Sequence, residues 1–352
     1  MEKKLNFKKF LLPVLMVILA VLLIVSMLLS RGTGERKKTF WCFDTEGSLT
    51  DYSYDSDKKF AKNYQTVYDT LKHYHDLFDI YNPHEGISGL YEVNRNAGVA
   101  PVKVPSELID FLEFCKEVYL KTDGEVNIAM GAVLSLWHEC RTDAATDPMN
   151  ARIPDTALLA EAAGHCDINN LIIDRQASTV YLADGKMSLD VGAVGKGYAV
   201  ERAAEQLISA GAEGYVLDVG GNIRILGAKP SGEGFRTGIR DPFGREDGYA
   251  KILTLSDISS VTSGGYERYY TVGDKKYHHI IDKDTLFPAE LVASVTVVCE
   301  DSGLADALST ALFCMDERSG LALVESLEGV EAVWVKKDGS VICSSGMDGY
   351  VN

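Results

Sequence analysis

Residues 189–226 read LDVGAVGKGYAVERAAEQLISAGAEGYVLDVGGNIRIL, and this stretch decides the fold class. Its first part predicts a short strand and a glycine-rich turn that leads into an amphipathic helix over 197–212. Its last part predicts two short strands, YVLDVGG and IRILGA, with a Gly-Gly pair between them. Helices and hairpin strands in separate blocks indicate an α+β fold with antiparallel sheets.

The same mixture of elements continues on both sides of this stretch. Apolar residues at helical spacing predict three earlier helices, over 60–80, 106–121 and 155–163. GEVNIAMGAVLSLW (124–137) predicts a loop that enters a buried helix. Short alternating segments predict strands after residue 214, and residues 294–346 predict a strand, two helices and a strand pair around a Lys-Asp-Gly turn.

The N-terminus carries the strongest local signal. A basic head at 1–9 precedes residues 10–29, which are almost all apolar. About 20 apolar residues are needed to cross a bilayer, whereas a cleaved signal has a core of about 7–15 residues that ends in small residues. The segment therefore predicts an uncleaved transmembrane anchor in the cell membrane, with a cleaved secretory signal as the alternative. Residues 30–38 are predicted to be a polar tether, and residues 39–352 an extracytoplasmic domain.

The composition is that of an acidic globular protein. Hydrophobic residues make up 46% of the 352 residues, enough for a buried core. The formal net charge is −16 and no basic patch is available to track a phosphate backbone, so nucleic acid is a poor candidate partner. The seven cysteines are scattered without a CxxC pair and are predicted to be buried thiols.

Two glycine-rich motifs are candidates for contact with a ligand. In 189–198 the glycines let the backbone approach a ligand closely, and the start of the following helix offers free N–H groups to a phosphate. The spacing matches neither the dinucleotide-binding nor the P-loop pattern, so a tight turn with Lys196 in solvent is the alternative. Gly220 and Gly221 form either a hairpin turn or a backbone cradle for a flat ligand.

Two adjacent histidines, His278 and His279, follow in a predicted strand. Neighbouring residues of a strand point to opposite faces, so at most one of the two can serve an interior site. A histidine near a carboxylate can move protons near neutral pH, as activation of a hydroxyl requires. A purely structural histidine is the alternative.

Asp306 and Thr310 are four residues apart in ADALSTALF (305–313), a predicted helix, and so share one face. A carboxylate and a hydroxyl on one face can bind a hard cation together. The alternative is that Asp306 acts with Ser302 as a cap near the helix start. The metal site is favoured because Thr310 repeats the polar choice on an otherwise apolar face.

Taken together and in this order, these motifs resemble the ApbE family, the FAD:protein FMN transferases. The resemblance extends from about Phe43 to Ser345 and rests on the segments FDT, GEVNIAMGAVLSLW, LDVGAVGKGY, DVGGN, TSGGYER, HHIID and ADALSTALF. It implies an ApbE-like domain that transfers FMN from FAD to a Ser or Thr hydroxyl of another protein and releases AMP. Magnesium is the implied cofactor, FAD the implied substrate, and an extracytoplasmic acceptor protein the implied partner.

The resemblance also implies roles for individual residues. The magnesium ligands would be Asp306, Thr310 and the backbone carbonyl of Ala193. The catalytic base would be His279, with Asp282 as its companion acid. The implied FAD contacts are Phe43, Asn127, Asp190, Lys196, Gly220, Gly221 and Ile280.

The chain departs from the family pattern in two places. The usual Asp-Pro-x-Thr-Gly is Asp282-Lys283-Asp284-Thr285-Leu286 here, and the usual Phe-Asp of the middle segment is Val126-Asn127. These changes affect the expected ligand contacts, whereas the expected magnesium ligands are intact. Two alternatives would use the same site: an FAD pyrophosphatase with water as the nucleophile, and a flavin-binding surface protein without turnover.

Overall fold

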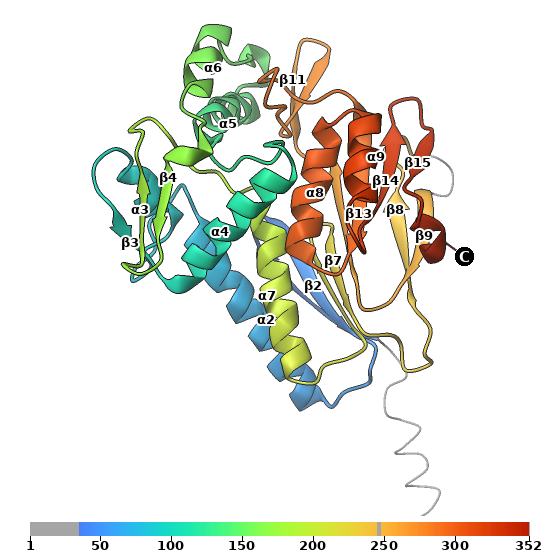
Figure 1. Ribbon diagram of the computed structural model, residues 1–352. Coiled ribbons are helices and arrows are strands. Elements are labelled where there is room, and N and C mark those ends of the chain that lie inside the picture. Colours follow the sequence, from blue (N-terminus) through green and yellow to red (C-terminus); the bar gives the residue numbers. More distant parts are fainter. Residues whose placement is uncertain (1–34, 245–247, 352) are drawn as a thin grey trace, which may run out of the picture.

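The computed structural model describes residues 35–244 and 248–351, and the fold is built around one antiparallel sheet (Figure 1). Its strands lie in the order β1-β2-β6-β7-β10-β13-β14-β15, and each neighbouring pair is antiparallel. Their bounds are β1 Arg36–Cys42, β2 Thr45–Asp51, β6 Tyr215–Val219, β7 Asn222–Leu226, β10 Ser259–Gly264, β13 Val292–Cys299, β14 Glu331–Lys336 and β15 Val341–Cys343. The antiparallel α+β prediction is confirmed.

Helices cover one face of this sheet. In Figure 1, α7 and α8 lie across it, and α2 runs beside α7. The helices are α2 Asp57–Phe78, α3 Leu90–Arg95, α4 Ser106–Lys121, α5 Gly131–Thr146, α6 Thr156–Ala163, α7 Gly195–Ser209, α8 Ser302–Cys314 and α9 Glu317–Glu325, with 3-10 turns η1 Pro148–Asn150, η2 Ile168–Asn170 and η3 Met347–Tyr350. The largest apolar core lies between α2, α4, α7 and the sheet.

The opposite face of the sheet is covered by a hairpin, β8 (Phe235–Arg240) with β9 (Tyr249–Leu255), and by η3. Ile225 of β7 packs into this side with Phe235 and Leu253. Successive residues of a strand alternate between faces, so Asn222 and Arg224 point to the helices. The same strand thus carries apolar residues to one side and polar residues toward α7 and α8.

Smaller elements complete the fold. A three-stranded sheet has the order β3-β5-β4, with bounds Val102–Lys103, Thr179–Leu182 and Leu171–Asp174. A second hairpin pairs β11 (Tyr269–Val272) with β12 (Lys275–His278). It packs against α5 and α6 around Trp137, and Figure 1 shows these elements together at one end of the molecule.

Three local expectations are corrected by the structure. The strand expected before the glycine-rich turn is reduced to a single bridge between Ser188 and Met130. The Ser188 carbonyl accepts from the N–H of Gly131, the first residue of α5, and the chain turns into a helix there. Strand β1 begins at Arg36, inside the predicted tether, because residues from Arg36 onward pair with β2. Ser106 is a plausible N-cap of the helix over 106–121 by its residue type, but Pro105 holds the cap position of α4, so Ser106 is the first helical residue.

Two further predictions concern the membrane and the cysteines. Within the two described ranges, no helix is long and apolar enough to cross a membrane. The head, the anchor and most of the tether lie outside the described residues, and the anchor stays a prediction. All seven cysteines are free, and the prediction of buried thiols is confirmed for five of them, whereas Cys166 and Cys343 are half-buried.

Candidate active site

The candidate site lies where the turns of two neighbouring hairpins meet. Strand β2 pairs with β6, so the β1–β2 turn at 43–44 lies beside the β6–β7 turn at 220–221. A Cβ at Gly220 would lie 2.5 Å from Thr45 Oγ1, and Gly220 has φ of +56°, so this position requires glycine. The space beside Gly221 is open. The Gly-Gly pair is therefore a hairpin turn, and it packs against the FDT segment.

The β1–β2 turn is strained. Phe43 and Asp44 have φ of +52° and +55°, and non-glycine residues in such conformations cost about 1–3 kcal/mol each. Arg268 Nη2 donates to both of their carbonyl oxygens, at 3.4 Å and 3.2 Å. The guanidinium of the TSGGYER motif thereby holds the FDT turn in this conformation.

The first turn of α7 is hydrogen-bonded to a carboxylate from α8. Gly197 is the third residue of α7, and the N–H groups of a helix's first turn have no acceptor within the helix. Its N–H donates to Asp306 Oδ2 at 2.7 Å. Within the described part of the chain, no donor bonds to the carbonyl of Ala193, which lies in the turn before α7. This unpaired carbonyl lies four residues before the N–H that contacts Asp306.

Asp306 is buried between α7 and α8, with 6% of its surface exposed. Its Oδ1 accepts a hydrogen bond from Asn222 Nδ2 at 3.3 Å, and its Oδ2 accepts the Gly197 bond. Burial raises the pKa of this carboxyl group, while the Lys196 ammonium, the Gly197 N–H and the Asn222 amide act to lower it. Asp301, not Asp306, caps α8. The capping alternative for Asp306 is therefore wrong.

Thr310 lies one turn after Asp306 on α8, as the spacing predicted. Its Oγ1 is 3.4 Å from the Asp306 carbonyl oxygen and 3.3 Å from Ser263 Oγ. Ser263 Oγ also lies 2.7 Å from Ser309 Oγ. These hydroxyls join β10 to α8 and orient Thr310.

Lys196 joins α7 to the β6–β7 hairpin. Its Nζ donates to the Gly220 carbonyl at 3.4 Å, and its charge acts to lower the pKa of both Asp218 and Asp306, which burial raises. The alternative of a lysine that only projects into solvent is therefore wrong. Lys196 lies where an anionic ligand of this turn would meet it.

The close contact of α7 with α8 predicts a large effect of one methyl group. A Cβ at Gly197 would lie 2.3 Å from the Ser302 carbonyl oxygen and 2.4 Å from Asp306 Cβ. We expect Gly197→Ala to lower the free energy of unfolding by about 1–3 kcal/mol, since the helices must separate. Urea unfolding measures this. Gly349→Ala is the control, because a Cβ there meets no atom within 4 Å; equal stability of the two variants would contradict the expectation.

The two histidines have different surroundings. His278 Nε2 bonds to the Ala289 carbonyl at 2.8 Å, and its ring packs edge-on against Phe313. His279 is accessible to solvent, and its Nδ1 lies 3.2 Å from the Arg268 carbonyl oxygen. Because a carbonyl only accepts, Nδ1 carries the proton and Nε2 keeps its lone pair. His278 is therefore structural, whereas His279 offers a base to an incoming group.

The pKa of His279 is lowered to about 4. Desolvation by closely packed protein atoms is the largest cause, and the positive charges of Arg268 and Arg141 act in the same direction. The bond to the Arg268 carbonyl opposes them. The imidazole is therefore neutral, the form that accepts a proton.

Asp282 does not pair with His279. Its Oδ1 accepts from the Asp284 and Thr285 N–H groups, at 3.1 Å and 2.6 Å, and so closes its own turn. The companion-acid role is unsupported by this geometry, since the Arg268 carbonyl occupies the place expected of the acid. Leu286, where the family pattern has glycine, has φ of +62°. The turn thus keeps a left-handed residue without glycine.

Three other implied FAD contacts, Asn127, Asp190 and Ile280, differ in how far their polar groups already have hydrogen-bond partners within the protein. The Asn127 side chain is engaged at both ends, with Nδ2 donating to the Cys166 carbonyl and Oδ1 accepting from Ala129 N–H, both at 2.9 Å. Asp190 accepts from Gly192 N–H at 2.9 Å, and burial raises its pKa. Ile280 is buried, and its carbonyl accepts from Ala289 N–H at 3.0 Å. Their contacts with FAD stay predictions.

The sequence interpretation missed several residues of this region. Arg141 Nη2 lies 2.9 Å from His138 Nδ1, and the His138 ring stacks on Tyr81 at 4.9 Å between centroids. Arg141 and His138 are on α5, directly after the GEVNIAMGAVLSLW segment. Asn222 was quoted within DVGGN without a role. These residues could have been found from the sequence as polar residues within or immediately after a recognised motif.

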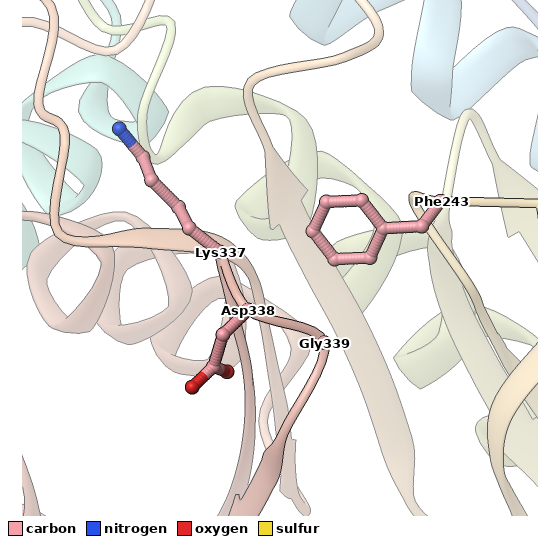
Figure 2. A pocket seen from close by; sticks show the side chains of 4 residues that line it. All are labelled: Phe243, Lys337, Asp338 and Gly339. Atoms are coloured by element: carbon pink, nitrogen blue, oxygen red, sulfur yellow. The ribbon is translucent and has the colours of Figure 1, made fainter.

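A shallow depression of about 280 Å³ lies elsewhere, at the β14–β15 turn (Figure 2). It is lined by Phe243, Lys337, Asp338 and Gly339, none of which belongs to the predicted site. The two charged side chains point away from the Phe243 ring in Figure 2. No polar groups converge there on a ligand, so the hydroxyl, carboxylate and imidazole groups described above remain the candidate site.

Known proteins are similar to this chain over most of its length. The FAD:protein FMN transferase of Treponema pallidum (strain Nichols) is 35% identical over 274 residues, 74% of each chain. That of Klebsiella pneumoniae (strain 342) is 29% identical over 79% of this chain and 84% of its own. The crystal structure of the ApbE protein of Thermotoga maritima superposes with a TM-score of 0.79 at 25% identity, covering 91% of this chain and all of that one. The ApbE family model matches residues 43–334, from the FDT turn through α8 into β14, and the chain therefore belongs to the ApbE family.

Proposed function

We propose that this chain is a magnesium-dependent FAD:protein FMN transferase, which attaches FMN to a Ser or Thr hydroxyl of an extracytoplasmic protein and releases AMP. The observation that carries the proposal is the buried Asp306 carboxylate, which accepts hydrogen bonds from the Gly197 N–H and the Asn222 amide. The carbonyl of Ala193, in the turn before α7, has no donor among the described residues. The relatives support the reaction, because proteins named FAD:protein FMN transferase match about three quarters of the chain.

The donor set fits magnesium. Asp306, Thr310 and Ala193 offer a carboxylate, a hydroxyl and a carbonyl, which are all hard oxygen donors. Among residues 35–244 and 248–351 there is no group of three or more His, Cys, Asp or Glu that could hold a metal. A single carboxylate is compatible with magnesium, which is usually held by one or two carboxylates together with substrate phosphates. When bound, magnesium would neutralise charge on the phosphate oxygens of FAD.

The chain's own residues account for the proton and the remaining charge. An acceptor hydroxyl has a pKa too high to ionise unaided, so a base must take its proton as its oxygen bonds to the FMN phosphorus. His279 Nε2 would take that proton while the Arg268 carbonyl holds the ring. The bond from phosphorus to AMP breaks at the same time. Lys196 places positive charge near the developing negative charge.

A direct assay tests the reaction. The full-length protein is incubated with FAD, magnesium and a flavoprotein subunit that carries a Ser or Thr acceptor. We expect a covalent FMN mass increment on the subunit and an equal amount of AMP. The second candidate, an FAD pyrophosphatase, is favoured by the solvent accessibility of His279, because a base in contact with solvent also activates water. FMN and AMP without an adduct would establish it, and flavin retained without turnover would establish a binding protein.

The pH dependence follows from the lowered pKa of His279. We expect kcat/KM for transfer to be level with respect to this group between about pH 6 and 8, and to fall only as the pH approaches 4, where the imidazole becomes charged. The pKa of His279 in the folded state lies below its unfolded value of about 6.5. The contribution of the neutral imidazole to the free energy of unfolding is therefore complete above pH 6.5 and is lost as the pH falls through 4. An inflection near 6.5 that disappears in a His279 variant would contradict this expectation.

The location is proposed from the N-terminal segment. We propose that residues 10–29 anchor the chain in the cell membrane and that the domain lies outside it. Protease added to intact cells should then degrade the domain while a cytoplasmic marker protein survives. A domain that is protected until the cells are lysed would refute the proposed orientation.

A further inference from the structure

Asn222 is a buried amide with half of its hydrogen-bonding capacity unused. It is the first residue of β7, and none of its surface is exposed. Its Nδ2 donates to Asp306 Oδ1 at 3.3 Å. Its Oδ1 has no hydrogen-bond partner in the described chain. A buried polar atom without a partner costs about 1–3 kcal/mol, so this oxygen calls for a donor or a cation.

The direction of the amide is set by its neighbour. If the amide were turned over, its oxygen would face the Asp306 carboxylate oxygen, and two acceptors would meet without a proton between them. Nδ2 therefore stays on Asp306, which leaves Oδ1 as the unpaired atom. Asn222 also cannot turn to the other face of the sheet, because β7 is paired on both sides, with Val219 of β6 and Val261 of β10 opposite Asn222.

The side chain points toward the same elements that hold the other oxygen donors. Arg224, two residues along β7 and so on the same face, lies 3.4 Å from Glu201 of α7. Glu201 in turn accepts from the Ser302 N–H at the start of α8, at 2.8 Å. This buried pair holds β7, α7 and α8 together one turn away from Asp306. Asn222 thus faces the junction where Asp306 and the first turn of α7 meet.

We propose that Asn222 is a further ligand of the cation site, with Oδ1 directed to a hard divalent cation and Nδ2 orienting the Asp306 carboxylate. The inference rests on the cation site of the proposed function and adds a residue to it. An amide oxygen is a suitable donor for such a cation. The site then has two protein groups from α8, one carbonyl from the turn before α7, and one amide from β7.

The test uses two substitutions with opposite expected effects. Binding of Mn²⁺, as a spectroscopic probe for magnesium, is measured on the full-length protein by the loss of the free-ion electron paramagnetic resonance signal, and magnesium is then added as competitor. We expect Asn222→Leu to weaken Mn²⁺ binding by about 10–100-fold, the loss typical of a removed ligand or orienting partner. We expect Asn222→Asp to bind at least as tightly as the unchanged protein, because it supplies an oxygen and a second negative charge.

The aspartate variant separates a ligand from a residue that only positions Asp306. A carboxylate cannot donate to Asp306, so a purely positioning role predicts weaker binding in Asn222→Asp, and that result would overturn the proposal. Unchanged binding in Asn222→Leu, or no binding by the unchanged protein, would also overturn it. If the leucine variant does not fold, the aspartate variant decides alone, and its melting temperature should rise more on addition of magnesium than that of the unchanged protein.

A matched control guards against a general effect of losing a buried amide. Asn63 is equally buried, 3% exposed, and donates to the Tyr215 hydroxyl at 3.1 Å, at the far end of β6 from the site. Asn63→Ala should bind Mn²⁺ like the unchanged protein. Failure of the proposed function is distinguishable, because a protein that binds Mn²⁺ through Asn222 but forms no FMN adduct would refute the transfer reaction alone.

Discussion

Replacement of Asp306 by alanine is expected to lower magnesium-dependent FMN transfer by roughly 10³-fold or more, since several kcal/mol of charge stabilisation are lost and each 1.4 kcal/mol is about tenfold in rate. Asp306 is the only carboxylate in the proposed ligand set, and only 6% of its surface is exposed. The measurement is the initial rate of adduct formation at saturating FAD over a range of magnesium concentrations.

Two further variants identify the cause. Asp306→Asn keeps an acceptor for the Gly197 N–H but removes the charge, so it should lose nearly as much activity as the alanine variant. Asp301→Asn removes a carboxylate from the same helix and keeps a good N-cap, so it should be close to normal. A fully active Asp306→Ala would falsify the metal assignment.

The second large effect is expected at His279. Replacement by alanine should lower the rate of transfer by about 10²–10⁴-fold, the contribution typical of a general base. FAD affinity should change little, because the imidazole acts on the acceptor hydroxyl. The loss should therefore appear in kcat, and flavin binding can be followed separately by fluorescence quenching.

The neighbouring histidine is the matched control for this variant. His278 packs against Phe313 and bonds to Ala289, so His278→Ala should lower the melting temperature and leave more of kcat than His279→Ala does. If both variants lost kcat equally and at equal stability, the distinction between a catalytic and a structural histidine would be wrong.

Much of the local structure was predictable because it depends on short-range patterns. The apolar spacing over 60–80 predicted α2, which runs over Asp57–Phe78, and the spacing within ADALSTALF placed Asp306 and Thr310 on one face of α8. The Gly-Gly pair predicted a hairpin, and both residues have positive φ. The strand predicted before the glycine-rich turn was wrong, because this segment pairs with the rest of the chain in one isolated bridge, between Ser188 and Met130, and not in a ladder.

The motifs also indicated which residues belong to one site, but not how they are connected. The resemblance paired His279 with Asp282, whereas the imidazole bonds to the Arg268 carbonyl and Asp282 closes its own turn. A companion residue three positions away is a natural expectation from sequence. The actual partner depends on where β11 and β12 place the backbone, and no local pattern records that.

The sequence by itself determined the class of the fold, the positions of most helices and the two residue types, carboxylate and imidazole, on which the proposed chemistry depends. Only the tertiary structure decided that Gly197 donates to Asp306 across 109 positions of sequence, and that Asn222 meets Asp306 across 84. The physical reason is range: helical and strand periodicity is set by neighbours a few residues apart, whereas these contacts exist only after α7, α8 and β7 have packed together.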